Sequence, residues 1–263
     1  MKPFSRFARA PIIPARAASS SLIQLCITAV LVLRTLTCSA GPFADKPPAK
    51  PGPAETKPSA TTVQAPKSPA DGAPQKEAEW KSLFDGKTLT GWKITDFAGT
   101  GKVEVQNGQI MLRSGLVLTG VTWTNEVSKT NYEITLEAMK VEGADFFCCL
   151  TFPVGNSHCS FVAGGWGGAV AGISSIDGMD ASENETTKFM NFEKNRWYRI
   201  RVRVTPAKIE TWVDDEKFVD QPIEDRKISM RPGEIELSAP LGVATYQTTA
   251  ALRNMRMRTI GAK

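Results

Sequence analysis

The chain has 263 residues, of which 41% are hydrophobic, a size and composition that suit one folded domain with extensions. The net charge of +5 comes from the first forty residues, which hold five Lys or Arg and no acid; the remainder has 27 basic and 27 acidic residues. A neutral remainder excludes a general electrostatic attraction to nucleic acid or to an anionic membrane surface.

The N-terminal segment has the features of an export signal. Basic residues precede an apolar run, Leu22–Leu33, and small residues stand before Gly41. This order predicts a signal peptide over 1–40 and a protein exported to the periplasm, the cell surface or the medium. The run is shorter than the roughly 20 residues of a membrane span, so we expect no span in the mature chain. An uncleaved anchor is the alternative.

Residues 41–78 form a segment rich in Pro, Ala and Lys. Nine of the 17 prolines lie here, with almost no large apolar side chain. Such a segment cannot bury enough surface to offset the entropy lost on ordering, which predicts a disordered linker. The folded domain is therefore expected over residues 79–263.

Strand signals dominate this domain. Asn107-Gly108 separates two apolar-rich runs within Val103–Leu112, which predicts a hairpin because a type I′ turn needs positive φ at both central residues. Asn131–Val141, Arg196–Val204 and Lys208–Val213 alternate between apolar and polar residues, as half-buried strands do. Shorter strands are expected near residues 146–152, 159–163, 169–174, 217–220, 234–238, 242–246 and 251–259.

No stretch of the domain has a convincing helical period. Many short strands separated by turn residues predict an all-β fold. The expected architecture is a two-sheet antiparallel β-sandwich of the jelly-roll type.

Three cysteines remain after the predicted cleavage: Cys148, Cys149 and Cys159. Neighbouring residues of a strand point to opposite faces, so only one of the first two can face Cys159. A disulfide is therefore one interpretation. The other is that all three are small buried apolar side chains.

The turn at Pro206 predicts a hairpin with Arg203 opposite Glu210 and Arg201 opposite Trp212. These would be an ion pair and a cation–π pair on one polar face, which needs no ligand. Alternatively, the face binds sugar, with Trp212 as a stacking platform and Arg199 and Arg201 donating to hydroxyl groups.

An acidic loop over 174–189 contains the carboxylates Asp177, Asp180 and Glu183. Hard cations such as calcium prefer several oxygen ligands from one flexible loop, so these three are candidate metal ligands. Their spacing does not match an EF-hand. A solvated loop is the other interpretation.

His158 and Trp166 stand out in the stretch 158–172. His158 is the only histidine, at the end of a predicted turn, and could act as a general base because its pKa lies near neutrality. It could equally be a structural surface residue. A single histidine excludes sites that need two or three within the chain. Trp166 lies between two glycine pairs and is either an exposed platform or a core residue.

The start of the domain reads EWKSLFDGKTLTGWKI over 79–94. Together with NGQI at 107–110, RWYRIRVRV at 196–204 and LRNMRMR at 252–258, it resembles the 3-keto-disaccharide hydrolase family, also described as a 3-keto-glucoside lyase and 3-keto-glucal hydratase domain. The resemblance covers residues 79–260. It implies a concanavalin A-like jelly roll, export, and action on carbohydrate. Members often carry a glutamate or glutamine in a middle strand where this chain has only small and apolar residues.

The chemistry implied by the resemblance starts from a ketone at C3 of a glycoside, which acidifies the proton at C2. A base removes that proton, the C1 substituent leaves, and water adds to the resulting glucal. Candidates are His158 as base, Asp177 as acid or as a metal ligand with Asp180 and Glu183, and Arg199 or Arg201 on the ketone oxygen. The cofactor would be a divalent cation such as calcium.

We therefore expect a domain that acts on an oligosaccharide or glycoside, as a 3-keto-glycoside hydrolase or lyase. The alternative is a glycan-binding module without catalysis, in which Trp166, Trp212, Arg199 and Arg201 contact the sugar. A structural domain held at the cell surface is a third interpretation.

Overall fold

The computed structural model describes residues 78–261. The predicted signal peptide over 1–40 and all but the last residue of the predicted linker over 41–78 lie outside this range. Within it, no helix is long and apolar enough to cross a membrane.

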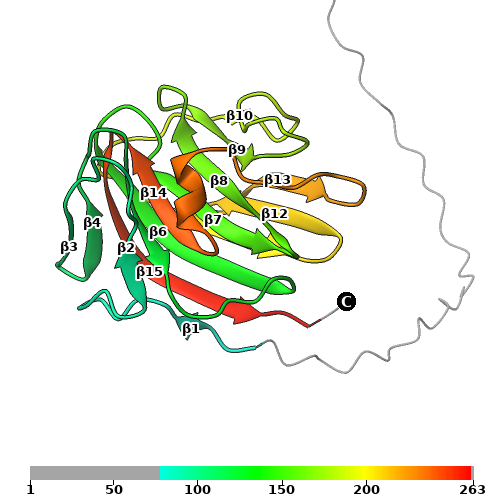
Figure 1. Ribbon diagram of the computed structural model, residues 1–263, viewed down its shortest axis with the longest axis horizontal. Helices are drawn as coiled ribbons and strands as arrows, with labels where there is room; N and C mark the ends of the chain where they lie inside the picture. The colour runs from blue at the N-terminus through cyan, green and yellow to red at the C-terminus, as the bar shows by residue number, and fades with distance from the viewer. Residues whose placement is uncertain (1–77, 262–263) are drawn as a thin grey trace, which may run out of the picture. The chain divides into compact units, whose positions relative to one another are not determined.

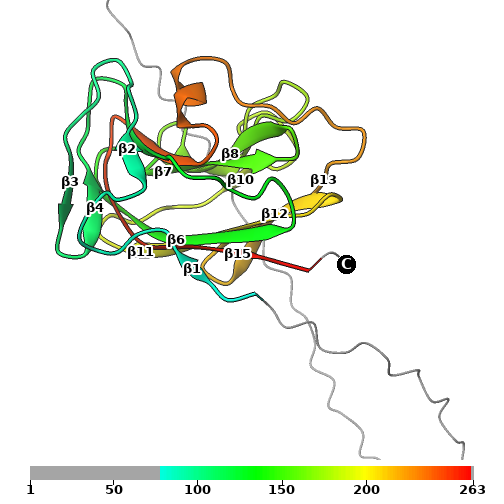
Figure 2. The same cartoon turned by 60° about the horizontal axis from the view of Figure 1, so that its bottom comes forward.

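Two antiparallel sheets pack face to face (Figures 1 and 2), which confirms the predicted sandwich. Sheet A has the order β13-β12-β11-β6-β15-β4-β3, with β1 also paired to β15, and sheet B has the order β10-β9-β8-β7-β14-β5-β2. The strands of sheet A are β1 (Lys81–Ser82), β3 (Val103–Gln106), β4 (Gln109–Leu112), β6 (Tyr132–Glu142), β11 (Trp197–Val204), β12 (Lys208–Val213), β13 (Glu216–Pro222) and β15 (Thr249–Thr259). Those of sheet B are β2 (Trp92–Ile94), β5 (Leu118–Trp123), β7 (Cys148–Val154), β8 (Ser157–Gly165), β9 (Val170–Ser174), β10 (Lys188–Phe189) and β14 (Gly242–Tyr246).

The core lies between the inner faces of the two sheets. Phe147, Phe192 and Tyr198 form an aromatic cluster there, with ring centroids 5.1–5.8 Å apart. The alternation predicted for β11 is confirmed, since Tyr198, Ile200, Val202 and Val204 are fully buried. The opposite face of β11 is partly exposed, whereas the outer face of sheet B carries a second cluster of buried residues that includes Leu118, Cys149 and Val162.

The predicted hairpin around Asn107-Gly108 is confirmed. β3 and β4 pair across this turn, in which Asn107 has φ 52° and Gly108 has φ 76°. The strand predicted near 234–238 is wrong, because Glu234–Ser238 forms a 3₁₀ helix, η1. Its two apolar residues alternate as in a strand, but Leu237 is exposed, and Gly233 (φ 125°) turns the chain into the helix.

The motif of residues 83–92 is structural. Leu83, Phe84 and Trp92 are buried, and the Trp92 indole donates to the carbonyl of Leu83 at 2.7 Å. Asp85 accepts hydrogen bonds from the backbone N–H groups of Thr88 and Lys87, which lower the pKa of its carboxyl. The motif therefore closes one edge of the sandwich, which explains its residue pattern without a ligand.

The three cysteines are free and buried, so the disulfide interpretation is wrong. Cys159 lies opposite Phe152 in the β7–β8 pair, whereas Cys148 lies opposite Ala163. Cys148 and Cys159 are therefore about 13 Å apart along the strands. This exceeds the ~7 Å limit for the Cα atoms of a disulfide. The second interpretation, of small buried side chains, is confirmed.

We expect these thiols to resist alkylation in the folded protein. Burial raises the pKa of the Cys149 thiol to about 12, and it also raises those of Cys148 and Cys159. Because the thiolate is the reactive form, iodoacetamide should label these cysteines only after denaturation. Peptide mass spectrometry of protein labelled with and without guanidinium checks this. Labelling of Cys148 or Cys159 without denaturant would contradict their burial.

Candidate functional site

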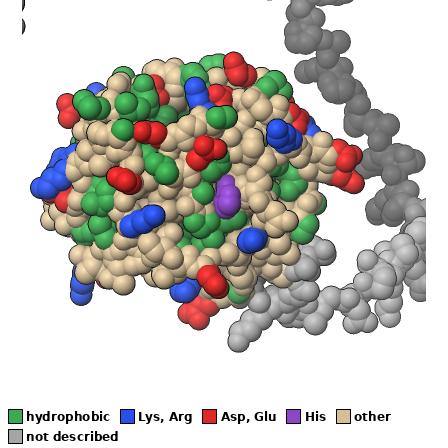
Figure 3. Space-filling view, in the orientation of Figure 1, with side chains coloured by type: hydrophobic (Ala, Val, Ile, Leu, Met, Phe, Trp, Pro, Cys, Tyr) green, Lys and Arg blue, Asp and Glu red, His purple; other side chains and the backbone are tan. Residues whose placement is uncertain are grey.

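A cleft of about 520 Å³ lies over the outer face of sheet B. Hydrophobic side chains are visible among charged ones on the face that Figure 3 presents. The floor of the cleft is formed by side chains of β5, β7, β8 and β9: Leu118, Cys149, Ser160, Val162 and Ser174. The opposite side chains of these strands point into the core, so the alternation of each strand sets the floor.

Three aromatic residues line the cleft: Phe146, Tyr246 and Trp166. The rings of Phe146 and Tyr246 are 5.7 Å apart at an interplanar angle of 42°, and the Tyr246 N–H donates to the Phe146 carbonyl at 3.1 Å. Trp166 is 40% exposed. The cleft therefore offers an accessible aromatic surface of the kind that stacks on flat apolar faces of ligands.

The turn between β8 and β9 presents Trp166. The tryptophan adopts the left-handed conformation (φ 49°), and the next N–H, of Gly167, donates to the Asp145 carboxylate at 3.0 Å. Gly168 has φ 106°, and a Cβ there would lie 2.7 Å from the Ala144 carbonyl oxygen. The glycines beside Trp166 thus allow a tight turn against residues 144–145. This favours the exposed-platform interpretation over a core tryptophan.

Most polar groups of the cleft are already bonded to protein groups. The Ser160 hydroxyl is 2.9 Å from that of Thr151, and the Ser174 hydroxyl donates to Asp180 at 2.9 Å. Asp145 accepts from the N–H groups of Phe146 and Gly167. The floor therefore offers a ligand mainly apolar contacts. Only a few side chains of the cleft have polar groups left to form hydrogen bonds with a ligand.

The segment before η1 supplies two of those side chains, Arg231 and Glu234. One nitrogen of Arg231 lies 2.9 Å from Asp180, and its side chain is 56% exposed. Both carboxylate oxygens of Glu234 accept from the Ala98 N–H, at a long 3.3 Å. A guanidinium with free N–H groups and a weakly bonded carboxylate can thus both reach a ligand in the cleft.

His158 is near the cleft but does not line it. It lies on β8, on the same face as Ser160 and about 7 Å further along the strand. Its side chain is half-buried, and burial, aided by the positive charge of Lys129, lowers the pKa of the imidazole. This shift favours the neutral imidazole, the form that a base requires.

The acidic loop is not arranged as a metal centre. Among residues 78–261 there is no group of three His, Cys, Asp or Glu that could hold an ion. Asp177 is paired with Arg226 at 2.6 Å, Asp180 with Arg231 at 2.9 Å, and Glu183 is exposed. The backbone N–H of Lys227 and the guanidinium of Arg226 lower the pKa of Asp177. The structure thus does not bring the three predicted metal ligands together.

We expect calcium to have no effect on the stability of this loop. A cation would have to displace the guanidinium groups that already compensate Asp177 and Asp180. Adding Ca²⁺ to chelator-treated protein should therefore leave the Tm unchanged in a differential scanning fluorimetry experiment, with Mg²⁺ as a control for ionic strength. A rise in Tm specific to Ca²⁺ would restore the metal-site interpretation.

Arg199, Arg201 and Trp212 lie on the outer face of sheet A, away from the cleft. The predicted register is confirmed, with Arg201 opposite Trp212 and Arg203 opposite Glu210. The Arg201 guanidinium carbon lies 3.8 Å from the centroid of the Trp212 ring, and the tryptophan is only 8% exposed. Trp212 therefore supports an arginine and is covered, so it is not a free platform for sugar.

The sequence predicts one residue of the cleft, Trp166. It gives no sign of the other lining residues Phe146, Tyr246, Arg231 and Glu234, which come from three segments far apart in the chain. No local pattern marks them, because they meet only through the pairing of β14 with β7 and the position of η1 beside β5 and β14. The proline before Gly233 was the one available sign that the segment 231–235 is not a strand.

Comparison with known proteins places the chain in a family. Residues 79–258 match the 3-keto-alpha-glucoside-1,2-lyase-like domain. The chain belongs to this family. The resemblance noted in the sequence is therefore confirmed, and the domain is carbohydrate-related. None of the curated proteins compared with the chain matches it.

Several solved structures are similar to this lyase-like domain at low identity. A protein of unknown function with a galectin-like fold, from Bacillus subtilis, has a TM-score of 0.46 at 10% identity, with 72% of this chain and 99% of that one covered. A suggested glycosyl hydrolase from Parabacteroides distasonis has a TM-score of 0.44 at 15% identity, covering 69% and 94%. The carbohydrate-binding module CBM66 from Bacillus subtilis has a TM-score of 0.42 at 13% identity, covering 64% and 96%.

Proposed function

We propose that the domain binds a glycoside in the cleft over sheet B. One face of a sugar ring carries mainly C–H groups and packs on an aromatic side chain, and the half-exposed Trp166 is the observation that supports this most directly. Arg231 and Glu234 would bond the hydroxyl groups. A space of about 520 Å³ lies within the usual range of small-molecule sites.

Membership of the lyase-like family favours a second function, elimination from a 3-keto-glycoside. The reaction needs a base at the C2 proton and a positive group at the C3 oxygen. Within the cleft, Glu234 could accept the proton and Arg231 could donate to the oxygen. His158 remains a candidate base from the sequence, although a ligand would have to extend beyond the residues that line the cleft to reach it.

Incubation with a 3-keto-glucoside and with the matching glucoside separates the two functions. Binding measured by calorimetry without product release supports a binding module, whereas release of the aglycone supports the lyase. If aglycone is released, Glu234→Gln and His158→Ala identify the base. We expect Glu234→Gln to lose turnover and His158→Ala to retain it; the reverse result would assign the proton transfer to His158. Absence of binding to either glycoside would overturn both functions.

Export remains a proposal supported by the basic and apolar character of the first forty residues. Mass measurement of the protein purified from its natural host would detect cleavage before Gly41. An intact N-terminus in a cytoplasmic fraction would contradict it.

A further inference from the structure

The outer face of sheet A contains three aligned triplets of side chains. β6 lies between β11 and β15, and its residues Glu133, Thr135 and Glu137 all point to this face. Each one is flanked by an arginine from either neighbouring strand. The triplets are Arg203–Glu133–Arg258, Arg201–Thr135–Arg256 and Arg199–Glu137–Arg253. They follow one another about 7 Å apart along the strands.

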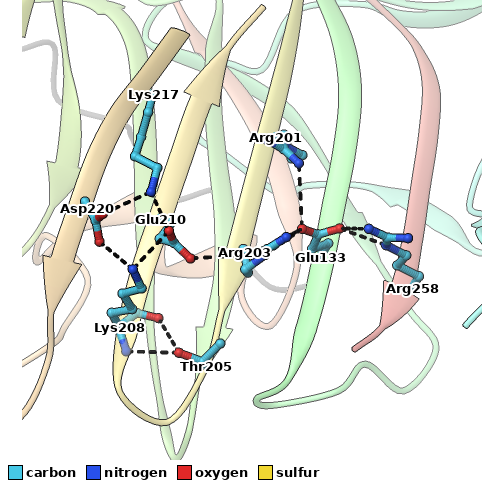
Figure 4. Close-up of polar contacts among 9 residues, drawn as sticks. All are labelled: Glu133, Arg201, Arg203, Thr205, Lys208, Glu210, Lys217, Asp220 and Arg258. Carbon is cyan, nitrogen blue, oxygen red and sulfur yellow. Dashed lines mark hydrogen bonds and ion pairs between the residues drawn. The ribbon is translucent and has the colours of Figure 1, made fainter. Parts of the chain in front are cut away.

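In the first triplet a carboxylate compensates the two arginines. Glu133 is fully buried, and its two oxygens lie 2.6 Å from Arg203 and Arg258 (Figure 4). Glu137 of the third triplet bonds Arg253 at 2.7 Å and the Asn254 amide at 2.8 Å. Arg199, on its other side, contacts the exposed Asp215. In both outer triplets an arginine–carboxylate pair is thus built into the sheet.

The middle triplet differs because its central residue has no charge. The Thr135 hydroxyl donates to the Ile200 carbonyl at 3.1 Å. The carboxylate nearest to Arg201 is Glu133, at 3.8 Å, which already binds two other arginines. Arg256 is exposed and has no ion pair among the described residues. Two guanidinium groups therefore flank a neutral side chain, with no carboxylate of their own.

The middle triplet is also accessible and preorganised. A hollow of about 140 Å³ extends from the middle triplet to the third and is lined by Thr135, Leu136, Glu137, Arg199, Asn254 and Arg256. Thr135 and Arg256 of the middle triplet are therefore accessible from it, whereas Arg201 does not line it. The Arg201 guanidinium carbon lies over the Trp212 ring, 3.8 Å from its centroid, and this contact restricts the rotamers of Arg201 before any ligand arrives. Burial lowers the pKa of Arg201, the Glu133 carboxylate partly offsets this, and the neighbouring arginines 203, 199 and 258 lower it further, so an added negative charge would be favourable.

The charge of this face contrasts with that of the domain. Residues 79–261 carry 21 Lys and Arg against 23 Asp and Glu, whereas the three triplets hold six arginines and two glutamates. Each outer triplet has one arginine more than glutamate and the middle triplet has two, so the local surplus of positive charge is greatest at the middle triplet.

We propose that the middle triplet binds the carboxylate of a uronic-acid sugar in an acidic polysaccharide. A carboxylate over Thr135 would repeat the arrangement that Glu133 makes with its two arginines, and the planar guanidinium matches a carboxylate with two parallel hydrogen bonds. The carbohydrate-related family of the domain favours a sugar as the carrier of that group. This site lies on the other sheet from the cleft, so it does not depend on the function proposed for the cleft.

Calorimetry with trigalacturonate at low salt tests the proposal on the native full-length protein. The fully methyl-esterified trigalacturonate provides the same sugar without charge, and a sulfated oligosaccharide tests the type of anion. We expect binding of the carboxylate form alone, weakened by added salt. No binding of trigalacturonate, equal binding of the ester, or binding of the sulfated sugar alone would overturn the proposal.

Two variants locate the site, one inside the middle triplet and one outside the triplets. Arg256→Gln should weaken binding about tenfold, as expected for the loss of a charge-assisted hydrogen bond. Arg113→Gln, which removes an arginine paired with Glu104 outside the triplets, should bind as the native protein does. Native affinity in Arg256→Gln, or loss of affinity in Arg113→Gln, would refute the location.

Thr135→Glu provides a second readout. The introduced carboxylate should bind Arg201 and Arg256, abolish trigalacturonate binding and raise the Tm. An unchanged affinity in a folded Thr135→Glu protein would contradict the proposal. Arg256→Gln alters only an exposed side chain, so it keeps the test decisive if Thr135→Glu does not fold.

Discussion

Replacing Trp166 with alanine is expected to weaken glycoside binding by about 2 kcal/mol, or roughly 30-fold, without changing the fold. The loss of affinity follows from removing the largest accessible apolar surface of the cleft, because the rings of Phe146 and Tyr246 already pack partly against each other. Calorimetric titration of the native and variant proteins with the same glycoside measures it.

Phe189→Ala is the matched control for this variant. Phe189 is 77% exposed on β10 and does not line the cleft. Phe189→Ala therefore also removes an exposed aromatic ring, but from outside the cleft. Native-like binding by Phe189→Ala together with weakened binding by Trp166→Ala would support the cleft. Equal affinities in all three proteins would refute the stacking role of Trp166.

Glu133→Gln should destabilise the domain by about 3–5 kcal/mol at pH 7. The side chain is fully buried and compensates Arg203 and Arg258, with Arg201 at 3.8 Å. Without the carboxylate, these guanidinium groups would repel one another on the face of the sheet. Urea unfolding followed by tryptophan fluorescence gives the free energy of unfolding for both proteins.

Glu104→Gln is the control, because Glu104 also binds two cations, Lys102 and Arg113, but does so at the edge of sheet A in contact with water. It should destabilise the domain far less than Glu133→Gln, because exposed ion pairs contribute little. A similar decrease in the free energy of unfolding in the two variants would show that the burial of Glu133 adds nothing to its contribution to stability.

The contribution of Glu133 to the free energy of unfolding should also depend on pH. Burial alone would raise the pKa of its carboxyl, but hydrogen bonds from Arg258 and Arg203 outweigh this and hold the pKa below its usual value. A carboxyl whose pKa is lower in the folded state stabilises the protein above its unfolded pKa of about 4.3, and this stabilisation is lost as the pH falls through the folded pKa. The native and Glu133→Gln proteins should therefore differ in free energy of unfolding by a constant amount from pH 7 to 5. This difference should shrink below about pH 4.

Local patterns predicted the strands whose two faces differ. The hairpin at Asn107-Gly108 and the β11–β12 pair were predicted because a turn signal and an alternating face were both present. β5 escaped prediction because Leu118–Trp123 is buried on both faces and contains Gly120 at its centre, so it shows no alternation. A Cβ on Gly120 would lie 2.6 Å from the Val243 carbonyl oxygen, a contact that no local pattern reveals.

The candidate sites were less predictable than the fold, because side chains from distant segments compose them. Trp166 could be recognised from its flanking glycines, whereas Arg231 and Glu234 reach the cleft only because η1 contacts β5 and β14. The sequence showed the arginines of β11, yet it could not show that Arg256 lies across Thr135 from Arg201. That juxtaposition depends on a shift of register in β15 between Arg253 and Arg256.

The position of β15 has a consequence for the order in which the domain can fold. This last strand lies between β6 and β4 and also pairs with β1, so it joins segments that are more than a hundred residues away in the chain. Until residues 249–259 have left the ribosome, β4 and β6 expose unpaired edges that could join strands of other nascent chains. Sheet A is therefore completed only once β15 is available to pair, and the many long-range contacts predict slow folding.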